Sequence, residues 1–227
     1  LYIVSTAIDI QTIFLKDYIQ EPNVLTRPEF LKQLSKKVNL IGVTGTHGKT
    51  STTALLAHIF MFNGINISYI YGGVTSFNGI GGHYGDESLP LLLETDEAFN
   101  TFKELEIDSL LVTNIDYDHV DHFGSYKKLV KAFETVINNV KNKCILNTDD
   151  KELLNLIRPG DISYSSTENS TYEVKYPNYF SHEGKEYTIN TKLIGNHFIS
   201  NITGAIALAK KNGISIEQSL NSIEHFV

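Results

Sequence analysis

The chain has 227 residues, of which 41% are hydrophobic, and its formal net charge is −7 at pH 7. This length allows a sizeable hydrophobic core, and the composition excludes a disordered protein. The acidic balance argues against a nucleic-acid coat, which normally presents a basic face to phosphates. Because no apolar run reaches the length of a bilayer-spanning helix and Leu1–Ser5 lack the features of a signal peptide, we expect a cytoplasmic protein without membrane contact.

Apolar strand-like runs alternate with helix-like segments along the chain. This alternation predicts an α/β fold with a P-loop-type, mostly parallel sheet flanked by helices. The first two thirds of the chain give these predicted elements, in order: strand Leu40–Val43, helix Thr50–Phe62, strand Ile65–Ile70, a glycine-rich loop Tyr71–Ser88, strands Leu89–Leu93 and Leu110–Val112, helix Ser125–Asn139, strand Lys143–Leu146 and helix Asp149–Ile157.

The last third of the chain has a different character. Tyr172–Leu193 is rich in Tyr, Thr and Val around a Glu183–Lys185 turn, which predicts a small antiparallel hairpin subdomain. Two helices, His197–Asn212 and Ile216–Phe226, are expected to close the chain. The single cysteine, Cys144, lies in an apolar strand-like run and is expected to be a small core residue in a reducing compartment.

The segment Val43–Ser51 joins the first predicted strand to the first predicted helix through small residues. Glycines let successive backbone amides turn inward, the new helix adds its positive end, and Lys49 adds a mobile cation. A hydroxyl directly after the lysine, that of Thr50, suits the Mg²⁺ that accompanies ATP. The segment therefore predicts a phosphate cradle made of Gly45, Thr46, His47, Gly48, Lys49, Thr50 and Ser51.

The cradle departs from the general pattern G-x-x-x-x-G-K-[ST]. That pattern places its first glycine where this chain has Val43, and the glycine stands at Gly45 instead. The alternative is an ordinary strand–turn–helix corner that contains glycine and lysine by chance.

Polar residues follow two further predicted strands. Glu94-Thr95-Asp96-Glu97 follows Leu89–Leu93, and Thr113–His119 follows Leu110–Val112. Ligands of open parallel sheets bind outside the carboxyl ends of the strands, so we expect these two tips and the cradle to converge. Glu94 is the expected carboxylate partner of Thr50 at Mg²⁺, and the alternative is an acidic first turn of the next helix.

His119 lies among acidic residues, namely Asp116, Asp118 and Asp121, with His122 nearby. Imidazole is a poor ligand for Mg²⁺, so residue chemistry alone does not single out His119. A zinc or manganese site is a rival hypothesis, although the spacing matches no structural zinc pattern.

Four motifs, taken in chain order, resemble the signatures of the Mur ligases: Gly45–Thr50, Glu94–Glu97, Thr113–Asp121, and Gly195–His197 with Asn201. The match spans most of the chain. Within that family, the cradle histidine and the Thr-Asn-Ile-Asp run look most like the members that join L-alanine to UDP-N-acetylmuramate in peptidoglycan synthesis.

The resemblance implies an ATP- and Mg²⁺-dependent ligase that forms an amide bond through an acyl phosphate. By this resemblance Lys49, Glu94 and His119 are catalytic, and Thr50, Glu94 and His119 hold metal. It adds Asn114, His197 and Asn201 to the nucleotide-binding residues. Two positions depart from the family pattern, because Phe198 stands where an adenine-contacting asparagine is expected and Phe133 lies nearest the position of a carbamylated lysine.

The resemblance also implies a domain organisation. Residues 1–36 would be the end of the UDP-sugar-binding domain, residues 37–227 the central ATP-binding domain, and the C-terminal domain that brings the amino acid would be absent. UDP-N-acetylmuramate and L-alanine would be the substrates, with no nucleic-acid partner. The alternatives are a murein tripeptide-recycling ligase, a ligase similar to folylpolyglutamate synthase, and, in another class, a P-loop nucleotide-binding switch module.

Overall fold

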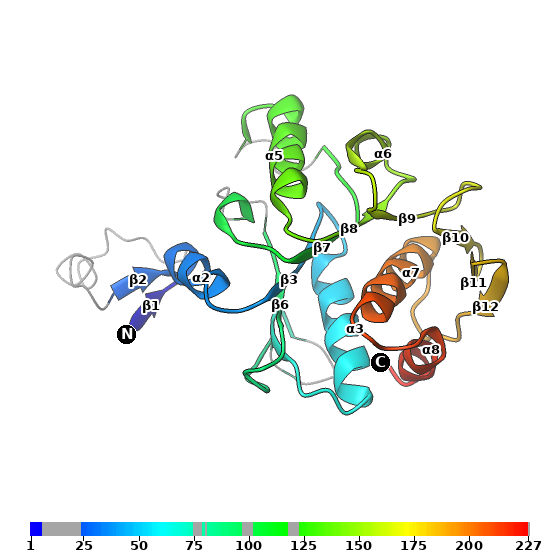
Figure 1. The fold of residues 1–227 in the computed structure, drawn as a ribbon, viewed down its shortest axis with the longest axis horizontal. Coiled ribbons are helices and arrows are strands. Elements are labelled where there is room, and N and C mark those ends of the chain that lie inside the picture. The colour runs from blue at the N-terminus through cyan, green and yellow to red at the C-terminus, as the bar shows by residue number, and fades with distance from the viewer. Residues whose placement is uncertain (6–23, 75–78, 80, 97–101, 118–122, 227) are drawn as a thin grey trace.

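One ten-stranded sheet with helices on both faces dominates the computed structural model, which describes residues 1–5, 24–74, 79, 81–96, 102–117 and 123–226 (Figure 1). The strand order is β12-β11-β10-β9-β8-β7-β3-β6-β4-β5. Its strands are β3 (Leu40–Thr44), β4 (Ser68–Ile70), β5 (Gly82–His83), β6 (Leu91–Glu94), β7 (Ser109–Val112), β8 (Cys144–Asn147), β9 (Ile162–Ser165), β10 (Tyr172–Lys175), β11 (Tyr179–His182) and β12 (Lys185–Thr188). The predicted α/β class with a mostly parallel sheet is therefore confirmed.

The strand that enters the cradle lies between the two strands with polar tips. β3 pairs in parallel with β6 on one side and with β7 on the other. Val43 lies opposite Glu94 in one pairing, and Thr44 lies opposite Val112 in the other. Since parallel strands present their carboxyl ends at one edge, this order brings the three polar tips together.

Alternate residues of the central strands face two different core clusters, as the period of a strand requires. Ile41 and Val43 of β3 pack in the cluster covered by α3 (Lys49–Phe62), α7 (Asn196–Lys211) and α8 (Ile216–Glu224). Leu40 belongs to the other cluster, which α5 (Tyr126–Asn139) and α6 (Lys151–Leu156) help to cover. Near-continuous apolar strands are thus buried on both faces, as expected of a parallel sheet.

Several helices begin at residues whose side chains cap them. Ser125 caps α5, Asp150 caps α6, and Ser215 forms a capping box with Gln218 at α8. The helices α3 and α7 differ, because the N-cap residue before each is a glycine, Gly48 or Gly195, which offers no side-chain cap. The first turns of these two helices are therefore left for other hydrogen-bond acceptors.

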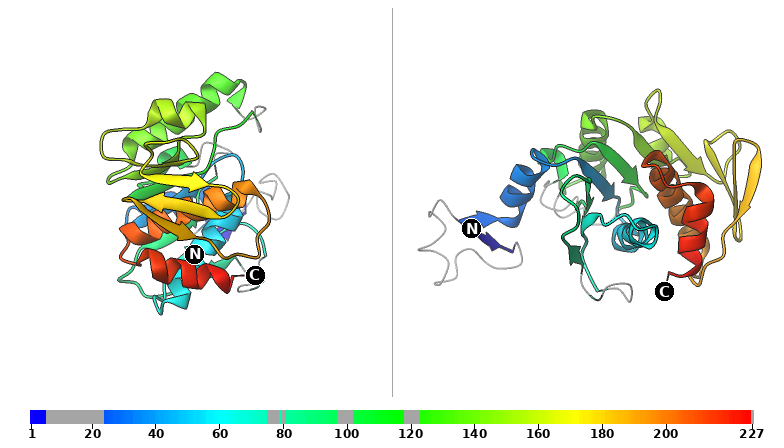
Figure 2. Two further views of the ribbon diagram at one scale, coloured as in Figure 1. Left: turned by 90° about the vertical axis from the view of Figure 1, so that its right-hand side faces the viewer. Right: turned by 60° about the horizontal axis from the view of Figure 1, so that its bottom comes forward.

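The N-terminal elements extend from one side of the molecule (Figures 1 and 2). β1 (Tyr2–Val4) pairs in parallel with β2 (Val24–Thr26), and α2 (Arg27–Ser35) follows directly. Thr26 and Glu29 form a capping box at the start of α2. Leu31 of α2 packs against the same core cluster as α5, so this helix is joined to the main body.

The expected hairpin is present, and it continues the large sheet. β11 and β12 are antiparallel around a Glu183–Gly184 turn in which both residues have positive φ. β10 pairs antiparallel with β11 and in parallel with β9, so these strands form an edge of the main sheet. Sequence analysis missed β9, although its alternating Ile-Ser-Tyr-Ser follows the Pro159-Gly160 break. It also missed the two-residue β5 inside the glycine-rich loop.

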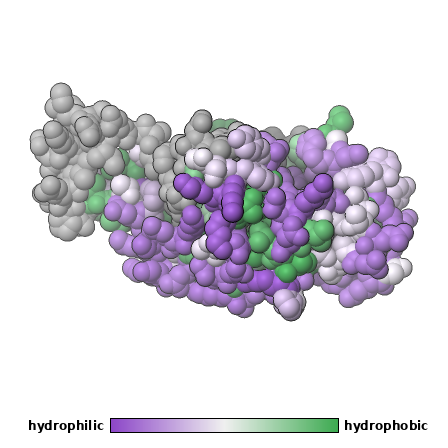
Figure 3. All heavy atoms as spheres, turned by 90° about the horizontal axis from the view of Figure 1, so that it is seen from above, coloured by the Kyte–Doolittle hydropathy of each residue, from purple (hydrophilic) through white to green (hydrophobic). Residues whose placement is uncertain are grey.

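The described part of the face shown in Figure 3 is mainly polar. Seen from above, hydrophilic side chains surround a hydrophobic patch near the centre of the described surface (Figure 3). Among the described residues, no helix combines the length and apolar character needed to cross a bilayer. Cys144 is fully buried in β8, in agreement with its predicted core position.

Candidate functional site

The loop between β3 and α3 is short and glycine-dependent. Gly45 and Gly48 have φ values of 134° and 82°, where residues with a Cβ are disfavoured. Val43 is fully buried in β3, so the loop begins only at Gly45, which explains the departure from the general P-loop pattern. The Lys49 ammonium lies 2.7 Å from the Gly45 carbonyl oxygen and 3.3 Å from that of Thr46, so it sits over the loop.

The tip of β7 holds the cradle loop by its backbone. Asn114 Oδ1 accepts from the His47 amide at 2.9 Å, while Asn114 Nδ2 donates to the His47 carbonyl at 3.0 Å. The Thr113 hydroxyl donates to the same carbonyl at 2.7 Å. The Thr46 amide donates to the Asn114 carbonyl at 3.0 Å. Asn114, expected to contact nucleotide, therefore has its side-chain amide engaged in shaping the cradle.

The tip of β6 meets the first turn of α3. The Thr50 hydroxyl donates to Glu94 Oε1 at 2.9 Å, and the other oxygen of Glu94 accepts from the Gly72 amide at 2.6 Å. Both side chains are half-buried. Hydroxyl and carboxylate oxygens are the hard ligands that Mg²⁺ prefers, and Mg²⁺ usually keeps several waters besides. The pair therefore fits a first magnesium site, and Gly72 is a partner that sequence analysis missed.

A cavity lies beside the cradle, where α3 and α7 both start. Its volume is about 500 Å³, which suits a small ligand. It is lined by His47, Gly48, Thr113, Asn114, Asn147, Asp149, Tyr176, His197, Ser200 and Asn201. Asn201 is only 8% exposed, and a Cβ built on Gly48 would lie 2.5 Å from its Nδ2. The predicted residues His197 and Asn201 thus lie beside the cradle.

The side-chain amide of Asn201 suits a polar ligand in this cavity. No hydrogen bond of that amide to another described residue is present, although the residue is nine-tenths buried. An amide in this position can donate to and accept from a bound ligand or a water molecule. Together with two helix N-termini that lack side-chain caps, this arrangement fits a nucleotide whose phosphates approach Gly48.

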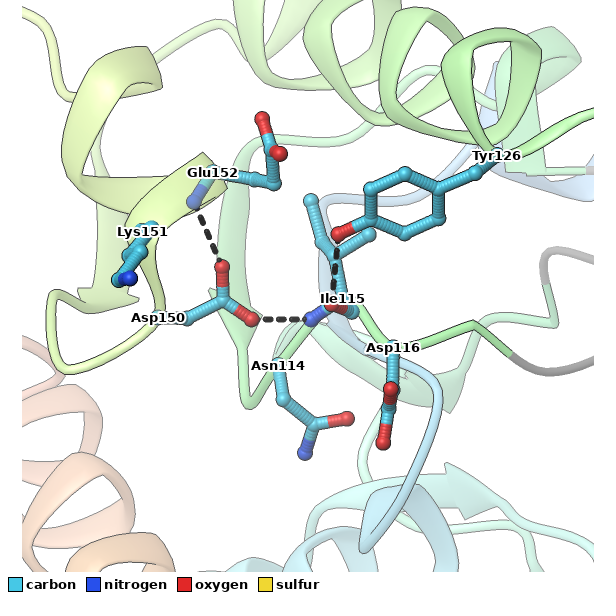
Figure 4. A pocket seen from close by; sticks show the side chains of 7 residues that line it. All are labelled: Asn114, Ile115, Asp116, Tyr126, Asp150, Lys151 and Glu152. Atoms are coloured by element: carbon cyan, nitrogen blue, oxygen red, sulfur yellow. Dashed lines mark hydrogen bonds between the residues drawn. The ribbon is translucent and has the colours of Figure 1, made fainter.

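A smaller cavity of about 340 Å³ lies on the other side of the β7 tip (Figure 4). Asp150 closes one wall, because its carboxylate accepts from the Ile115 amide at 2.6 Å and from the Glu152 amide at 2.9 Å. The Tyr126 hydroxyl donates to the Ile115 carbonyl at 3.3 Å. Burial and the nearby carboxylates of Glu152, Asp150 and Asp116 raise the pKa of Tyr126, which keeps this phenol neutral.

His119 lies outside the described residues, as do Asp118, Asp121 and His122. Within the part of the chain that the structure describes, no group of three or more His, Cys, Asp or Glu side chains forms a metal site. Asp116 is described, and its carboxylate lies 3.5 Å from His47 Nε2 with both side chains exposed. The Asp116 amide also donates to the Thr46 hydroxyl at 2.8 Å, which again ties the β7 tip to the cradle.

Sequence analysis missed the cavity residues Asn147, Asp149 and Tyr176. The first two follow an apolar strand in the same way as Glu94 and Thr113 do, so the rule used for the other strand tips would have found them. Tyr176 lies in the connection between β10 and β11, and its place beside the tip of β8 depends on the fold of the sheet edge.

A family model described as the Mur ligase middle domain matches residues 43–209. Among curated proteins, the UDP-N-acetylmuramate--L-alanine ligase of Wigglesworthia glossinidia brevipalpis is 30% identical over 219 residues, covering 89% of this chain and 46% of that protein. The chain therefore spans about half the length of the curated relatives it matches.

Two solved structures share the fold. UDP-N-acetylmuramate-alanine ligase from Thermotoga maritima superposes with a TM-score of 0.84 at 24% identity, covering 99% of this chain and 54% of that one. UDP-N-acetylmuramate:L-alanyl-gamma-D-glutamyl-meso-diaminopimelate ligase from Neisseria meningitides gives a TM-score of 0.82 at 18% identity, covering 100% and 78%. At these identities the two likenesses establish the fold.

Proposed function

We propose that this chain is the ATP-binding part of a ligase that joins UDP-N-acetylmuramate to L-alanine, because it belongs to the Mur ligase family. The observation that carries the proposal is the contact between Thr50 and Glu94 at the mouth of a glycine cradle that also holds Lys49. In our proposal this arrangement would serve as a phosphate site and a magnesium site at adjacent residues. The reaction belongs to the synthesis of peptidoglycan precursors.

We further propose that residues 37–227 form the central domain of a longer enzyme and that residues 1–36 belong to its UDP-sugar-binding domain. The match of the family model to residues 43–209 supports the first boundary. The short parallel sheet of β1 and β2, which is separate from the ten-stranded sheet, supports the second. The domain that positions the amino acid would then be supplied by another part of the protein.

The proposed chemistry begins with two anions, the triphosphate and the carboxylate of the sugar substrate. Their repulsion must be neutralised before the carboxylate oxygen can attack the γ-phosphorus in line. In our proposal Lys49 supplies a cation, and Mg²⁺ held by Thr50 and Glu94 would supply further positive charge. This attack breaks the bond between the γ-phosphorus and the β-bridging oxygen, so ADP leaves as the acyl phosphate forms. The amine of L-alanine then attacks the acyl carbon and loses a proton, and inorganic phosphate leaves as the amide forms.

Four residues have assigned roles in this proposal. Lys49 contacts the β- and γ-phosphates, while Thr50 and Glu94 hold the first Mg²⁺. His119 is proposed to help hold a second Mg²⁺ near the substrate carboxylate, a role that rests on its place in the Thr113–Asp121 motif. Asp116, three residues before His119 in the sequence, is held at the cradle by the bond from its amide to the Thr46 hydroxyl.

The test is release of inorganic phosphate from ATP by the full-length gene product in the presence of UDP-N-acetylmuramate. We expect release to require an amino acid, with L-alanine preferred over glycine and L-serine. Lys49→Ala should abolish the activity. Cys144→Ala is the matched control, since Cys144 is buried in β8 away from the cradle, and this variant should keep the activity.

Other outcomes would identify the alternatives. Activity only with a murein tripeptide would favour the recycling ligase and contradict L-alanine as the substrate. Phosphate release that no amino acid influences would favour a nucleotide-dependent switch module, because such a module has no need for an acceptor carboxylate or amine.

A further inference from the structure

We propose that Asp150 is a positioning residue of the nucleotide site, because it holds the tip of β7 in the place from which that tip braces the phosphate cradle. The proposal rests on the nucleotide-binding function proposed above. Asp150 acts through Ile115, whose backbone amide and carbonyl are both bonded by side chains from the starts of α5 and α6 (Figure 4).

The residues on either side of Ile115 hold the cradle. The Asn114 carbonyl accepts from the Thr46 amide at 3.0 Å, and the Asp116 amide donates to the Thr46 hydroxyl at 2.8 Å. The Asn114 side chain also bonds the backbone of His47. The Ile115 side chain, by contrast, is buried in the core cluster that α5 helps to cover. The tip of β7 is therefore held between the cradle on one side and the starts of α5 and α6 on the other.

The two carboxylate oxygens of Asp150 have different partners. Oδ1 accepts from the amides of Glu152 and Leu153 at 2.9 and 3.2 Å, and so caps α6. Oδ2 accepts from the Ile115 amide at 2.6 Å, across 35 positions of the chain. A helix cap needs only one oxygen, which serine or asparagine supplies equally well. Capping therefore does not account for the second bond, which is of the strong type that a charged acceptor makes.

Tyr126 adds a second bond to the same residue. Its hydroxyl donates to the Ile115 carbonyl at 3.3 Å, and the raised pKa of this phenol keeps the donor protonated. A neutral donor at this distance makes a weaker bond than a carboxylate acceptor at 2.6 Å. Asp150 therefore supplies the stronger hold on the β7 tip, and Tyr126 supplies the weaker one.

Loss of the Asp150 bond should be felt by the phosphates of a bound nucleotide. A hydrogen bond to a charged acceptor is worth a factor of about ten or more in an equilibrium constant. Because Tyr126 and the pairing of β7 with β3 still hold the tip, we expect the lower end of that range, about a tenfold loss of ATP affinity. Adenosine has no phosphates for the cradle to bind, so its affinity should not change.

The experiment measures dissociation constants of ATP with Mg²⁺ and of adenosine for the full-length gene product by isothermal titration calorimetry. Asp150→Ser keeps an oxygen that can cap α6, but its side chain is too short to reach Ile115, and Asp150→Asn keeps the size but has one acceptor oxygen. Both variants should bind ATP about tenfold more weakly and adenosine as the wild type does. ATP affinity within twofold of the wild type, or an equal loss for adenosine, would overturn the proposal while the nucleotide-binding function stands. If the wild type binds no ATP, both fail.

Ser215→Ala is the matched control for a lost helix cap. The Ser215 hydroxyl caps α8 by accepting from the Gln218 amide at 3.1 Å, so this variant should lower the melting temperature and leave ATP affinity unchanged. A loss of ATP affinity equal to that of Asp150→Ser would show that capping alone explains the effect, and the proposal would fail.

Tyr126→Phe tests the weaker hold and leaves the α6 cap intact. It should weaken ATP binding at least twofold, less than Asp150→Ser does, with adenosine binding unchanged. If neither Asp150 variant folds, this variant decides the proposal, because unchanged ATP affinity would show that the hold on Ile115 does not matter to the cradle.

Discussion

Replacing Gly45 by alanine should destabilise the protein and weaken nucleotide binding together. A Cβ at this position would lie 2.1 Å from the Thr113 hydroxyl oxygen and 3.0 Å from backbone atoms of Asn114. The Thr113 hydroxyl would have to move, although it donates to the carbonyls of Thr44 and His47. The substitution therefore disrupts the packing of the β7 tip against the cradle.

The expected cost has three parts. A residue with a Cβ at φ 134° costs about 1–3 kcal/mol in backbone strain. Overpacking against Thr113 adds about 1–3 kcal/mol, and weakening of its hydrogen bonds adds about 0.5–1.5 kcal/mol for each bond lost. We therefore expect the free energy of unfolding to fall by roughly 2.5–7.5 kcal/mol, the sum of these ranges with one hydrogen bond lost.

Gly64 provides a matched control for the strain alone. It has φ 76°, and nothing lies within 4 Å of a Cβ built there. Gly64→Ala should cost only about 1–2 kcal/mol and should leave the dissociation constant for ATP unchanged.

Urea unfolding followed by far-UV circular dichroism measures both variants, because the chain contains no tryptophan for fluorescence. If Gly45→Ala and Gly64→Ala lose equal stability, the close approach of Gly45 to the β7 tip is not energetically important, and our account of the cradle is wrong.

Three further predictions concern the cradle and the core. Asn114→Ala removes both side-chain hydrogen bonds to the His47 backbone. By calorimetry, this variant should bind ATP about tenfold more weakly and adenosine with unchanged affinity. An equal loss of affinity for ATP and adenosine would contradict a cradle-shaping role of Asn114. Glu94→Gln removes the charge beside Thr50, so ATP should bind with a clearly higher requirement for Mg²⁺, and an unchanged magnesium titration would speak against this site. Burial raises the pKa of the Cys144 thiol from 9.0 to about 12, so ionisation of the thiol favours the unfolded state. The free energy of unfolding should therefore fall as pH rises from about 9 to 12. Urea unfolding at several pH values should show that Cys144→Ala removes this part of the alkaline loss of stability.

Much of the fold followed from local sequence patterns. The apolar run Leu89–Leu93 predicted β6, and the predicted helix Thr50–Phe62 ends at the same residue as α3, directly before Asn63-Gly64. These predictions succeed because burial on both faces and helix termination are decided by neighbouring residues. β9 was missed because a four-residue strand with two serines has a weak local signal, and its pairing with β8 supplies what the local sequence lacks.

The sequence by itself determined the chemistry available at the site. It placed Lys49 and Thr50 at the start of a helix and Glu94 at the end of a strand, since those positions follow from glycine spacing and apolar runs. Only the tertiary structure decided which groups meet. Glu94 bonds Thr50 because β6 lies beside β3, and Asn114 holds the backbone of His47 because β7 lies on the other side. Strand order arises from packing between distant segments, so no local pattern could have specified it.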